Sequence, residues 1–213
     1  MALYACVAAG DESALTIINV YNPASPTFKG SIQGAGSPNY LWRAYKVFVK
    51  ANYAYVAASW DDALTIIDVS DPANPLFKGS IQGSANYLNG AVGVFVKGDY
   101  AYVAAYMDDA LTIIDVTDPA NPTFKGSIQG AGSPNYLKYA WDVFVKGNYA
   151  YVAANLDDAL TIIDVTDPAN PTFKGSIQGA ANYLNGARGV YVVDNYAYVA
   201  AYKEPLLPLH LLL

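Results

Sequence analysis

A segment of 47 to 49 residues recurs along most of the chain, and this repetition limits the folds that the chain can adopt. The string ALTII begins at Ala14, Ala63, Ala110 and Ala159. A repeat of this length is typical of the four-stranded blades of a β-propeller, whereas helical repeats would space their apolar residues three and four positions apart. Each repeat therefore predicts one unit that buries its apolar faces against neighbouring copies.

The copy at residues 143–179 shows the strands that such a unit needs. VFVKG (143–147) predicts a first strand and a tight turn, YAYVAA (149–154) a second strand, ALTIIDV (159–165) a third, and TFKGSIQG (172–179) a fourth. The third strand is apolar on both faces, as expected for a sheet packed between two other sheets. We name these strands a, b, c and d in chain order.

We therefore predict an all-β fold, a β-propeller of four-stranded antiparallel blades, with about four blades of which three are complete. Residues 1–202 form the repeats, and residues 203–213 form a non-repeat apolar tail that holds the only histidine, His210. The first copy supplies strands b, c and d, and the last copy supplies strands a and b. These could join as one composite blade that closes a ring, with one b strand left over, or the chain could be an open arc of a larger ring or polymer.

Charge and targeting signals exclude several classes of partner. A net charge of -6 with 12 scattered Lys and Arg residues gives no basic stripe for nucleic acid. The first residues lack the basic and apolar segments of a signal peptide, and the tail is too short and too rich in proline to span a bilayer. We expect no nucleic-acid partner and no membrane insertion.

The single cysteine, Cys6, lies where every other copy has a tyrosine. One cysteine cannot form an internal disulfide, and we interpret it as inert packing.

The string ALTIIDVSDPANP (63–75) and its counterparts, with the preceding NYAYVAA, resemble the LVIVD-repeat β-propeller family. In that family a NYAYVA strand is followed by an LxIVDVSDPxxP strand and turn. The resemblance covers almost all of residues 3–202, and the first copy departs furthest, as ALTIINVYNPASP. It implies a secreted or cell-surface propeller of bacteria or archaea with a binding or adhesive role and no assigned enzymatic activity.

Paired carboxylates follow strand b in three copies. They could supply oxygen ligands to a hard cation such as calcium, but the alternating, glycine-turned spacing of a dedicated calcium loop is absent. We expect instead hairpins that cap their own backbone amides, and no metal or other cofactor. The pairs are Asp61 and Asp62, Asp108 and Asp109, and Asp157 and Asp158.

The residues do not indicate a catalytic centre. No histidine precedes His210, Cys6 lies within a predicted strand, and near-identical blades do not give an acid and a base the distinct environments that they need. We expect that the protein is not an enzyme. The remaining catalytic alternative is a metal on the central axis near Lys46 and Asp142.

The copies differ most at one end of the strands. In a propeller the d-to-a and b-to-c loops emerge on one rim, here called the variable rim, and the a-to-b turns and c-to-d loops on the other, the uniform rim. The uniform rim repeats KGN, KGD and DPANP, whereas the variable rim carries WRAYK (42–46), NGAVG (89–93), KYAWD (138–142) and NGARG (185–189). We therefore expect ligand binding on the variable rim.

The candidate ligand-binding residues on the variable rim are mostly aromatic. They are Trp42, Tyr45, Trp60, Tyr106, Lys138 and Trp141, together with the tyrosines of a recurrent NYL motif, Tyr40, Tyr87, Tyr136 and Tyr183. The alternative for the NYL tyrosines is that they only pack one loop over the next blade, as amphipathic covers.

Our leading hypothesis is a non-enzymatic binding or adhesion module, secreted or on the cell surface, that presents its variable rim to a glycan or protein partner. Aromatic faces pack against sugar rings, fixed polar groups orient hydroxyls, and repeated sites add avidity. The alternative is a structural subunit that self-assembles into a homo-oligomer or filament by pairing its unmatched blade edges, residues 3–9 and 196–201, between chains.

Overall fold

The computed structural model describes residues 3–202, and the predicted tail with His210 lies outside the described residues. The described chain forms five antiparallel sheets, which we number as blades 1 to 5. Three are complete, as predicted: blade 2 with β4 (Ala44–Lys50), β5 (Tyr53–Ala58), β6 (Ala63–Asp68) and β7 (Leu76–Gln82); blade 3 with β8 (Ala91–Lys97), β9 (Tyr100–Ala105), β10 (Ala110–Asp115) and β11 (Thr123–Gln129); blade 4 with β12 (Ala140–Lys146), β13 (Tyr149–Ala154), β14 (Ala159–Asp164) and β15 (Thr172–Gln178).

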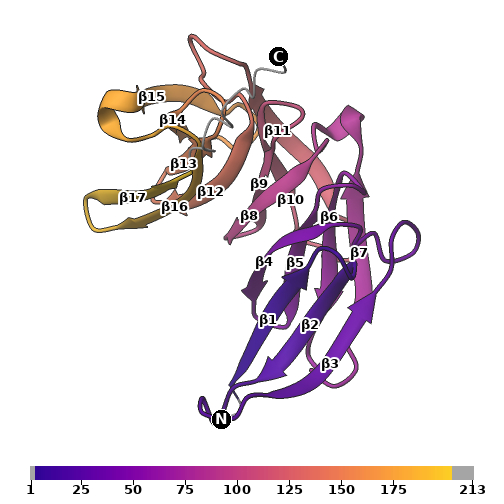
Figure 1. The fold of residues 1–213 in the computed structure, drawn as a ribbon. Helices are drawn as coiled ribbons and strands as arrows, with labels where there is room; N and C mark the ends of the chain where they lie inside the picture. Colours follow the sequence, from indigo (N-terminus) through magenta and orange to yellow (C-terminus); the bar gives the residue numbers. More distant parts are fainter. Residues whose placement is uncertain (1–2, 203–213) are drawn as a thin grey trace, which may run out of the picture.

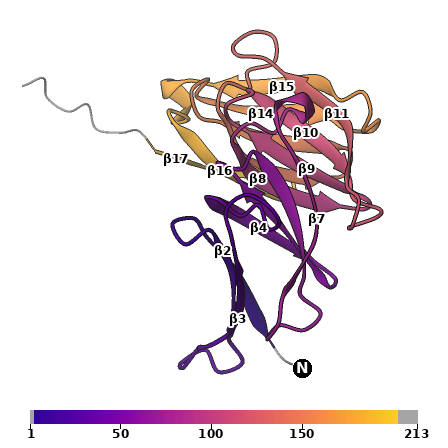
Figure 2. The ribbon, with the colours of Figure 1, turned by 90° about the vertical axis from the view of Figure 1, so that its right-hand side faces the viewer.

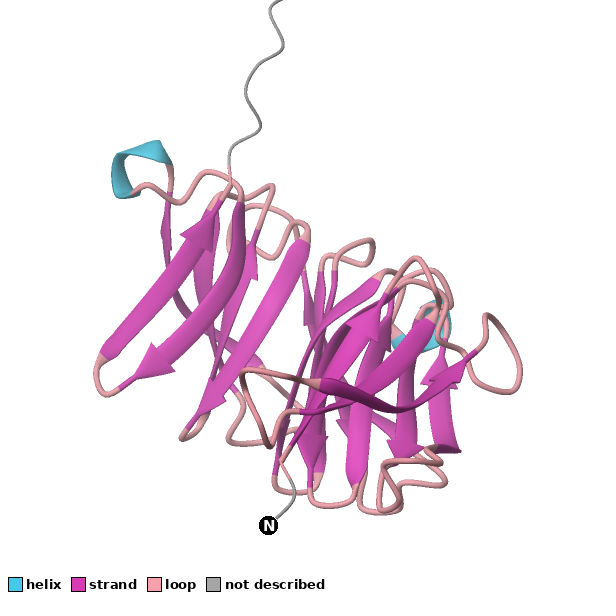
Figure 3. Ribbon diagram, turned by 60° about the horizontal axis from the view of Figure 1, so that its bottom comes forward, coloured by secondary structure: helices cyan, strands magenta, loops and turns pink. Residues whose placement is uncertain are grey.

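The first and last blades are partial. Blade 1 holds β1 (Tyr4–Ala9), β2 (Ala14–Asn19) and β3 (Thr27–Gln33), which correspond to strands b, c and d, and blade 5 holds β16 (Ala187–Val193) and β17 (Tyr196–Ala201), which correspond to strands a and b. Two short 3-10 helices, η1 (Ser84–Asn86) and η2 (Ala180–Asn182), lie in d-to-a loops, outside the sheets (Figure 3).

The blades follow one another around an arc. Strands β4, β8, β12 and β16 lie side by side as the a strands of successive blades. Figure 1 shows blade 1 and blade 5 at opposite ends of the arc, and Figure 2 shows blade 1 at the lower end, beside blade 2, against which it packs. Blades 1 and 5 are separate sheets, so the described residues form the open arc and not the composite blade.

The core lies between the blades. Between blades 3 and 4 it contains Tyr102 and Ile113 from one sheet and Val143 and Val145 from the other, and each is at most 4% exposed. Strand c is buried on both faces in blades 2 and 3, as the sequence predicted. Burial of these apolar faces is the main force that holds successive blades together.

Every strand a carries a β-bulge near its start. In β12, Ala140 lies opposite Ala154 and Asp142 lies opposite Ala153, so Trp141 is an extra residue without a partner. A bulge bends the strand and re-aims the side chain of the extra residue. The extra residues are Tyr45 in β4, Val92 in β8, Trp141 in β12 and Arg188 in β16.

Candidate functional site

The acidic pairs hold the loops of the variable rim in place. Asp61 accepts hydrogen bonds from the backbone amides of Gly36 (3.0 Å) and Trp42 (2.8 Å), which lie in the loop that enters its own blade. Asp109 accepts one from the amide of Tyr139 (2.8 Å), in the loop that enters the next blade. The amides therefore belong to the d-to-a loops, where we had expected the pairs to cap their own hairpins.

The same two bonds recur in the other copies. The first carboxylate of each pair, Asp108 or Asp157, accepts a backbone amide from the loop that enters its own blade. The second carboxylate, Asp62 or Asp158, accepts the amide of Gly90 or Gly186 in the loop that enters the next blade. In the described part of the chain no group of three or more acidic, histidine or cysteine side chains lies together as a metal site.

The NYL motif also has a structural role. Asn135 donates from Nδ2 to the carbonyl of Gln129 (2.6 Å), and the carbonyl of Tyr136 accepts a bond from Thr161 Oγ1 (2.6 Å). Leu137 is fully buried. The recurrence of the motif is thus explained by its asparagine side chain, its tyrosine carbonyl and its buried leucine, and the rings of Tyr40, Tyr87 and Tyr136 take no part in these contacts.

The bulge at Trp141 places its indole at the centre of an aromatic cluster. Its ring lies 5.5 Å from that of Tyr45 at 86° and 5.5 Å from that of Tyr106, which in turn lies 5.2 Å from Tyr139. Such edge and tilted pairs are favourable aromatic geometries. Burial raises the pKa of the Tyr106 phenol.

A second aromatic pair lies on the same rim. Trp42 and Trp60 meet edge to face at 5.1 Å, and the Arg43 guanidinium lies 4.8 Å from the centre of the Trp60 ring. The two indoles are 43% and 50% exposed, so they offer ring surface to a ligand. Beside them lies a shallow hollow of about 310 Å³, which Ser59, Asp62 and Met107 also line.

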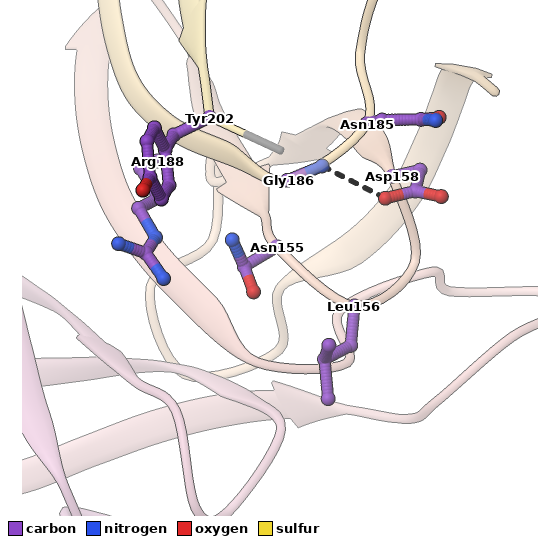
Figure 4. A pocket seen from close by; sticks show the side chains of 7 residues that line it. All are labelled: Asn155, Leu156, Asp158, Asn185, Gly186, Arg188 and Tyr202. Carbon is purple, nitrogen blue, oxygen red and sulfur yellow. Dashed lines mark hydrogen bonds between the residues drawn. The ribbon is translucent and has the colours of Figure 1, made fainter. Parts of the chain in front are cut away.

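A deeper pit opens between blades 4 and 5. Its volume is about 420 Å³, and Asn155 and Gly186 stand where the preceding boundary has the larger Tyr106 and Tyr139. Its lining consists of Asn155, Leu156, Asp158, Asn185, Gly186, Arg188 and Tyr202. Figure 4 shows the Asn155 amide between Arg188 on one side and Asp158 on the other.

Arg188 joins the pit to the aromatic cluster. Its guanidinium carbon lies 4.9 Å from the centre of the Trp141 ring and 5.2 Å from that of Tyr202, a favourable position for a cation between two π-faces. Its Nε is buried and has no hydrogen-bond partner in the described residues. A buried N–H donor without a partner costs free energy, and Arg188 is therefore held in place chiefly by its stacking between the two rings.

The remaining sequence candidates lie elsewhere or pair with each other. The exposed Lys138 side chain takes part in none of the aromatic or cation–π contacts of residues 3–202. Near the axis, Lys46 Nζ donates to Asp142 Oδ1, and Asp142 Oδ2 accepts the Val190 amide (3.0 Å). Both axial groups are thus engaged with protein partners.

Sequence reasoning missed the polar half of the site. It favoured aromatic residues, whereas Asn155, Asn185 and Arg188 form the pit. The signal was present in the divergent NGARG segment and in the Asn155-Leu156 loop, which differ from the other copies. What could not be foreseen is that these segments from two blades meet at one space.

These features define the class of protein: a propeller-type repeat protein whose blades carry a variable rim. The LVIVD repeat profile matches residues 3–33, 43–82, 90–129, 138–178 and 186–207. The chain therefore belongs to the LVIVD repeat family, which confirms the resemblance seen in the sequence. A search of curated proteins found no match.

Solved structures similar to this chain share its propeller-type fold. They include a protein from Bacteroides uniformis named as a candidate 6-phosphogluconolactonase (TM-score 0.70, 14% identity, 94% of this chain and 60% of that one). Another is a candidate 6-phosphogluconolactonase from Bacteroides fragilis (0.68, 14%, 89% and 58%). A third is a protein from Lactobacillus plantarum (0.66, 15%, 81% and 53%). The chain thus spans little more than half the length of these structures.

Proposed function

We propose that this chain is a non-enzymatic binding module that holds a glycan on its variable rim, with one sugar unit in the pit and further units against the aromatic cluster. The observation that carries the proposal is the pit of about 420 Å³ beside the Trp141 ring. Its volume falls in the range of roughly 300–1,000 Å³ that small-ligand sites occupy. A flat protein partner would not need such a pit, so a glycan is favoured over a protein.

The chemistry of the pit suits a sugar. The side-chain amides of Asn155 and Asn185 can both donate to and accept from hydroxyl groups, and Arg188 adds fixed donors. The Tyr202 ring lines the pit, and the Trp141 ring lies 4.9 Å from the Arg188 guanidinium that lines it. This combination of a few oriented polar groups with aromatic walls is typical of small-molecule sites.

Two further observations support binding without catalysis. The acidic pairs are engaged with backbone amides, and residues 3–202 contain no histidine to act as a base. The activity in the names of the two Bacteroides proteins is not part of the proposal, because an identity of 14% indicates a shared fold alone.

A secreted or cell-surface location is part of the same proposal and rests on the family resemblance. Among the described residues, no helix has the length and apolar character needed to cross a bilayer.

Intrinsic fluorescence gives a direct test, because all three tryptophans, Trp42, Trp60 and Trp141, lie on the variable rim. Titration with soluble neutral, amino and uronic-acid oligosaccharides should change the emission and saturate for at least one class. The same oligosaccharides should fail to bind after Trp141→Ala or Asn155→Ala.

Leu76→Ala serves as a matched control, because Leu76 is exposed on an outer strand away from the rim. Saturable binding that survives both rim substitutions would place the site elsewhere. No response to any of the three sugar classes would contradict glycan binding. Turnover of a bound sugar would contradict the non-enzymatic assignment.

A further inference from the structure

Neighbouring blades meet in the same way at three boundaries. A glycine of strand d lies under the c-to-d turn of the next blade, so close that a Cβ on Gly126 would lie 2.5 Å from the carbonyl oxygen of Pro168. Gly30 and Gly79 lie at the same distance from the corresponding turns. The backbone can approach this closely only where no side chain intervenes, so this glycine contact is a regular part of each boundary.

The two ends of the arc each hold one half of the glycine contact. At the C-terminal end, a Cβ on Gly175 of blade 4 would meet nothing within 4 Å. At the N-terminal end, Pro26 in the turn of blade 1 is exposed, whereas its counterparts Pro75 and Pro122 are buried. The uncovered glycine and the uncovered turn are therefore complementary.

The two ends of the arc also hold, separately, the donor residue and the acceptor residue of a hydrogen bond that every complete blade forms. In blade 3, Thr112 of strand c donates to the carbonyl of Tyr87 in the loop that enters the blade (2.6 Å), and blades 2 and 4 repeat this bond. Blade 1 has the threonine, Thr16, and the loop entering blade 5 has the tyrosine, Tyr183, whose side chain is 89% exposed. Within residues 3–202 these two residues do not bond.

Strand β1 leaves a cavity at the position where strand b of the complete blades has a tyrosine side chain. On strand b of blades 2 and 3, Tyr55 and Tyr102 are 4% exposed and pack in the core against the next blade. On β1 that position is Cys6, and beside it lies a cavity of about 300 Å³. Its lining includes Tyr4, Ile17, Val49 and Val69, the counterparts of residues that surround Tyr55. On β17 the same position is Tyr198, which is 59% exposed.

We propose that a second copy of this chain completes each open end by exchange of strand b. Strand β17 of one copy takes the place of β1 beside β2 of the other, which gives a composite blade of β16, β17, β2 and β3. Tyr198 then fills the cavity beside β2, the turn of blade 1 covers Gly175, and Thr16 reaches the carbonyl of Tyr183. The partner is identified by these contacts, because each repeats one found inside the arc.

The exchange costs few interactions. Strands β1 and β17 differ only at Cys6 and Tyr198, and both are six-residue strands. The ladder that β1 makes with β2 is therefore replaced residue for residue by that of β17. Strand β1 is released from the sheet, the number of paired strands stays the same, and two head-to-tail contacts close a ring if the rotation allows. The pit on the variable rim keeps all its residues, because β17 stays with β16.

Light scattering coupled to size exclusion over a hundredfold dilution series tests the proposal. We expect a species of twice the 22.7 kDa chain mass at high concentration. Larger multiples would show the same contact without ring closure and would also support exchange. A mass of 22.7 kDa at every concentration would overturn the proposal.

Two substitutions at opposite ends of the arc, each expected to favour the monomer, test the exchange itself. Cys6→Tyr should fill the cavity within one chain, hold β1 in place and shift the population to monomer by at least tenfold. Gly175→Val should also give monomer, because its side chain would lie where the turn of blade 1 packs, although it meets nothing in the free chain. If both variants assemble like the parent, the exchange model is wrong. The exposed Leu76→Val on β7 controls for a general effect of strand d substitutions.

A cross-link tests the register. In blade 2, Tyr53 lies opposite Asp68, so we expect Tyr196 of one copy opposite Asn19 of the other. Paired strand positions lie within the Cα separation that a disulfide can bridge. In a Cys6→Ser background, the double variant Asn19→Cys and Tyr196→Cys should form covalent dimers on oxidation. A disulfide confined to single chains would instead indicate that the arc closes on itself, against the proposal.

Discussion

The uniform rim and the variable rim use their repeated residues for different purposes. Toward the uniform rim, backbone carbonyls of the DPANP turns pack on the strand d glycines of the preceding blade, which leaves no room for a side chain at those glycines. On the variable rim the acidic pairs and NYL motifs fix the backbone from beneath, and the side chains above them are free to differ. The comparison teaches that sequence variation on a repeat protein can be confined to positions whose backbone is held by invariant neighbours.

The largest loss of stability is expected at the glycine contact, where no space remains for a side chain. Gly126→Val would place its Cβ 2.5 Å from the Pro168 carbonyl oxygen, and overpacking of this kind costs about 1–3 kcal/mol. Urea unfolding of the variant should show a clearly lower midpoint. Ala131→Val, at an exposed position of a d-to-a loop, should change it little; equal losses for both would mean that the glycine contact is not special.

The second largest loss of stability is expected for the acidic pairs that hold the backbone of the variable rim. Asp109→Ala would leave the Tyr139 amide without its acceptor, and loss of one partner of a shielded hydrogen bond costs about 1–3 kcal/mol. We expect a lower free energy of unfolding for this variant. Ser13→Ala is the matched change in blade 1, where serine replaces the second aspartate, and thermal unfolding should leave it near the parent. A stable Asp109→Ala protein would show that the pairs are dispensable.

A smaller effect on stability is expected for the variable side chains themselves. The double variant Trp42→Ala and Trp60→Ala removes a half-exposed edge-to-face pair, and such pairs contribute about 0.5–1.5 kcal/mol. Retention on an immobilised oligosaccharide that the parent binds should fall by at least tenfold, while the melting temperature changes little. A parallel loss of binding and of stability would contradict a surface role for the two indoles.

The smallest effect is expected for the dependence of stability on pH in the acid range. In the DPANP turns, hydrogen bonds from the side chain of Asn121 and the amide of Ala120 lower the pKa of Asp118, and the same pattern lowers the pKa of Asp71 and Asp167. A pKa that folding lowers stabilises the native state above the unfolded pKa of about 3.9 and ceases to do so as pH falls through the folded pKa. Stability should therefore decline below about pH 4.

The matched variant is Asp118→Asn, because Asn22 already occupies this place in blade 1. Its unfolding midpoint should depend less on pH than that of the parent in this acid range. A steeper dependence on pH would mean that the Asp118 carboxylate does not stabilise the native state in the way expected here.

The sequence predicted the strands well because their determinants are local. The predicted strand at 149–154 is β13 (Tyr149–Ala154), bounded by a Gly-Asn turn and an acidic loop. The bulge at Trp141 could not be predicted, because it depends on the register between β12 and β13 and not on either strand alone. The pit was missed for a similar reason: Asn155 and Arg188 belong to different blades, and only the packing of blade 4 against blade 5 brings them to one space.

The glycine contact also determines how the chain would respond to mechanical force. The boundaries between blades 1 and 4 repeat the same packing, and a pull on the two termini would load them in series. A single unravelled blade releases 47 to 49 residues, which is about 160–170 Å of extended chain. A force–extension trace should therefore show three evenly spaced steps for the complete blades, with shorter steps for the partial blades 1 and 5.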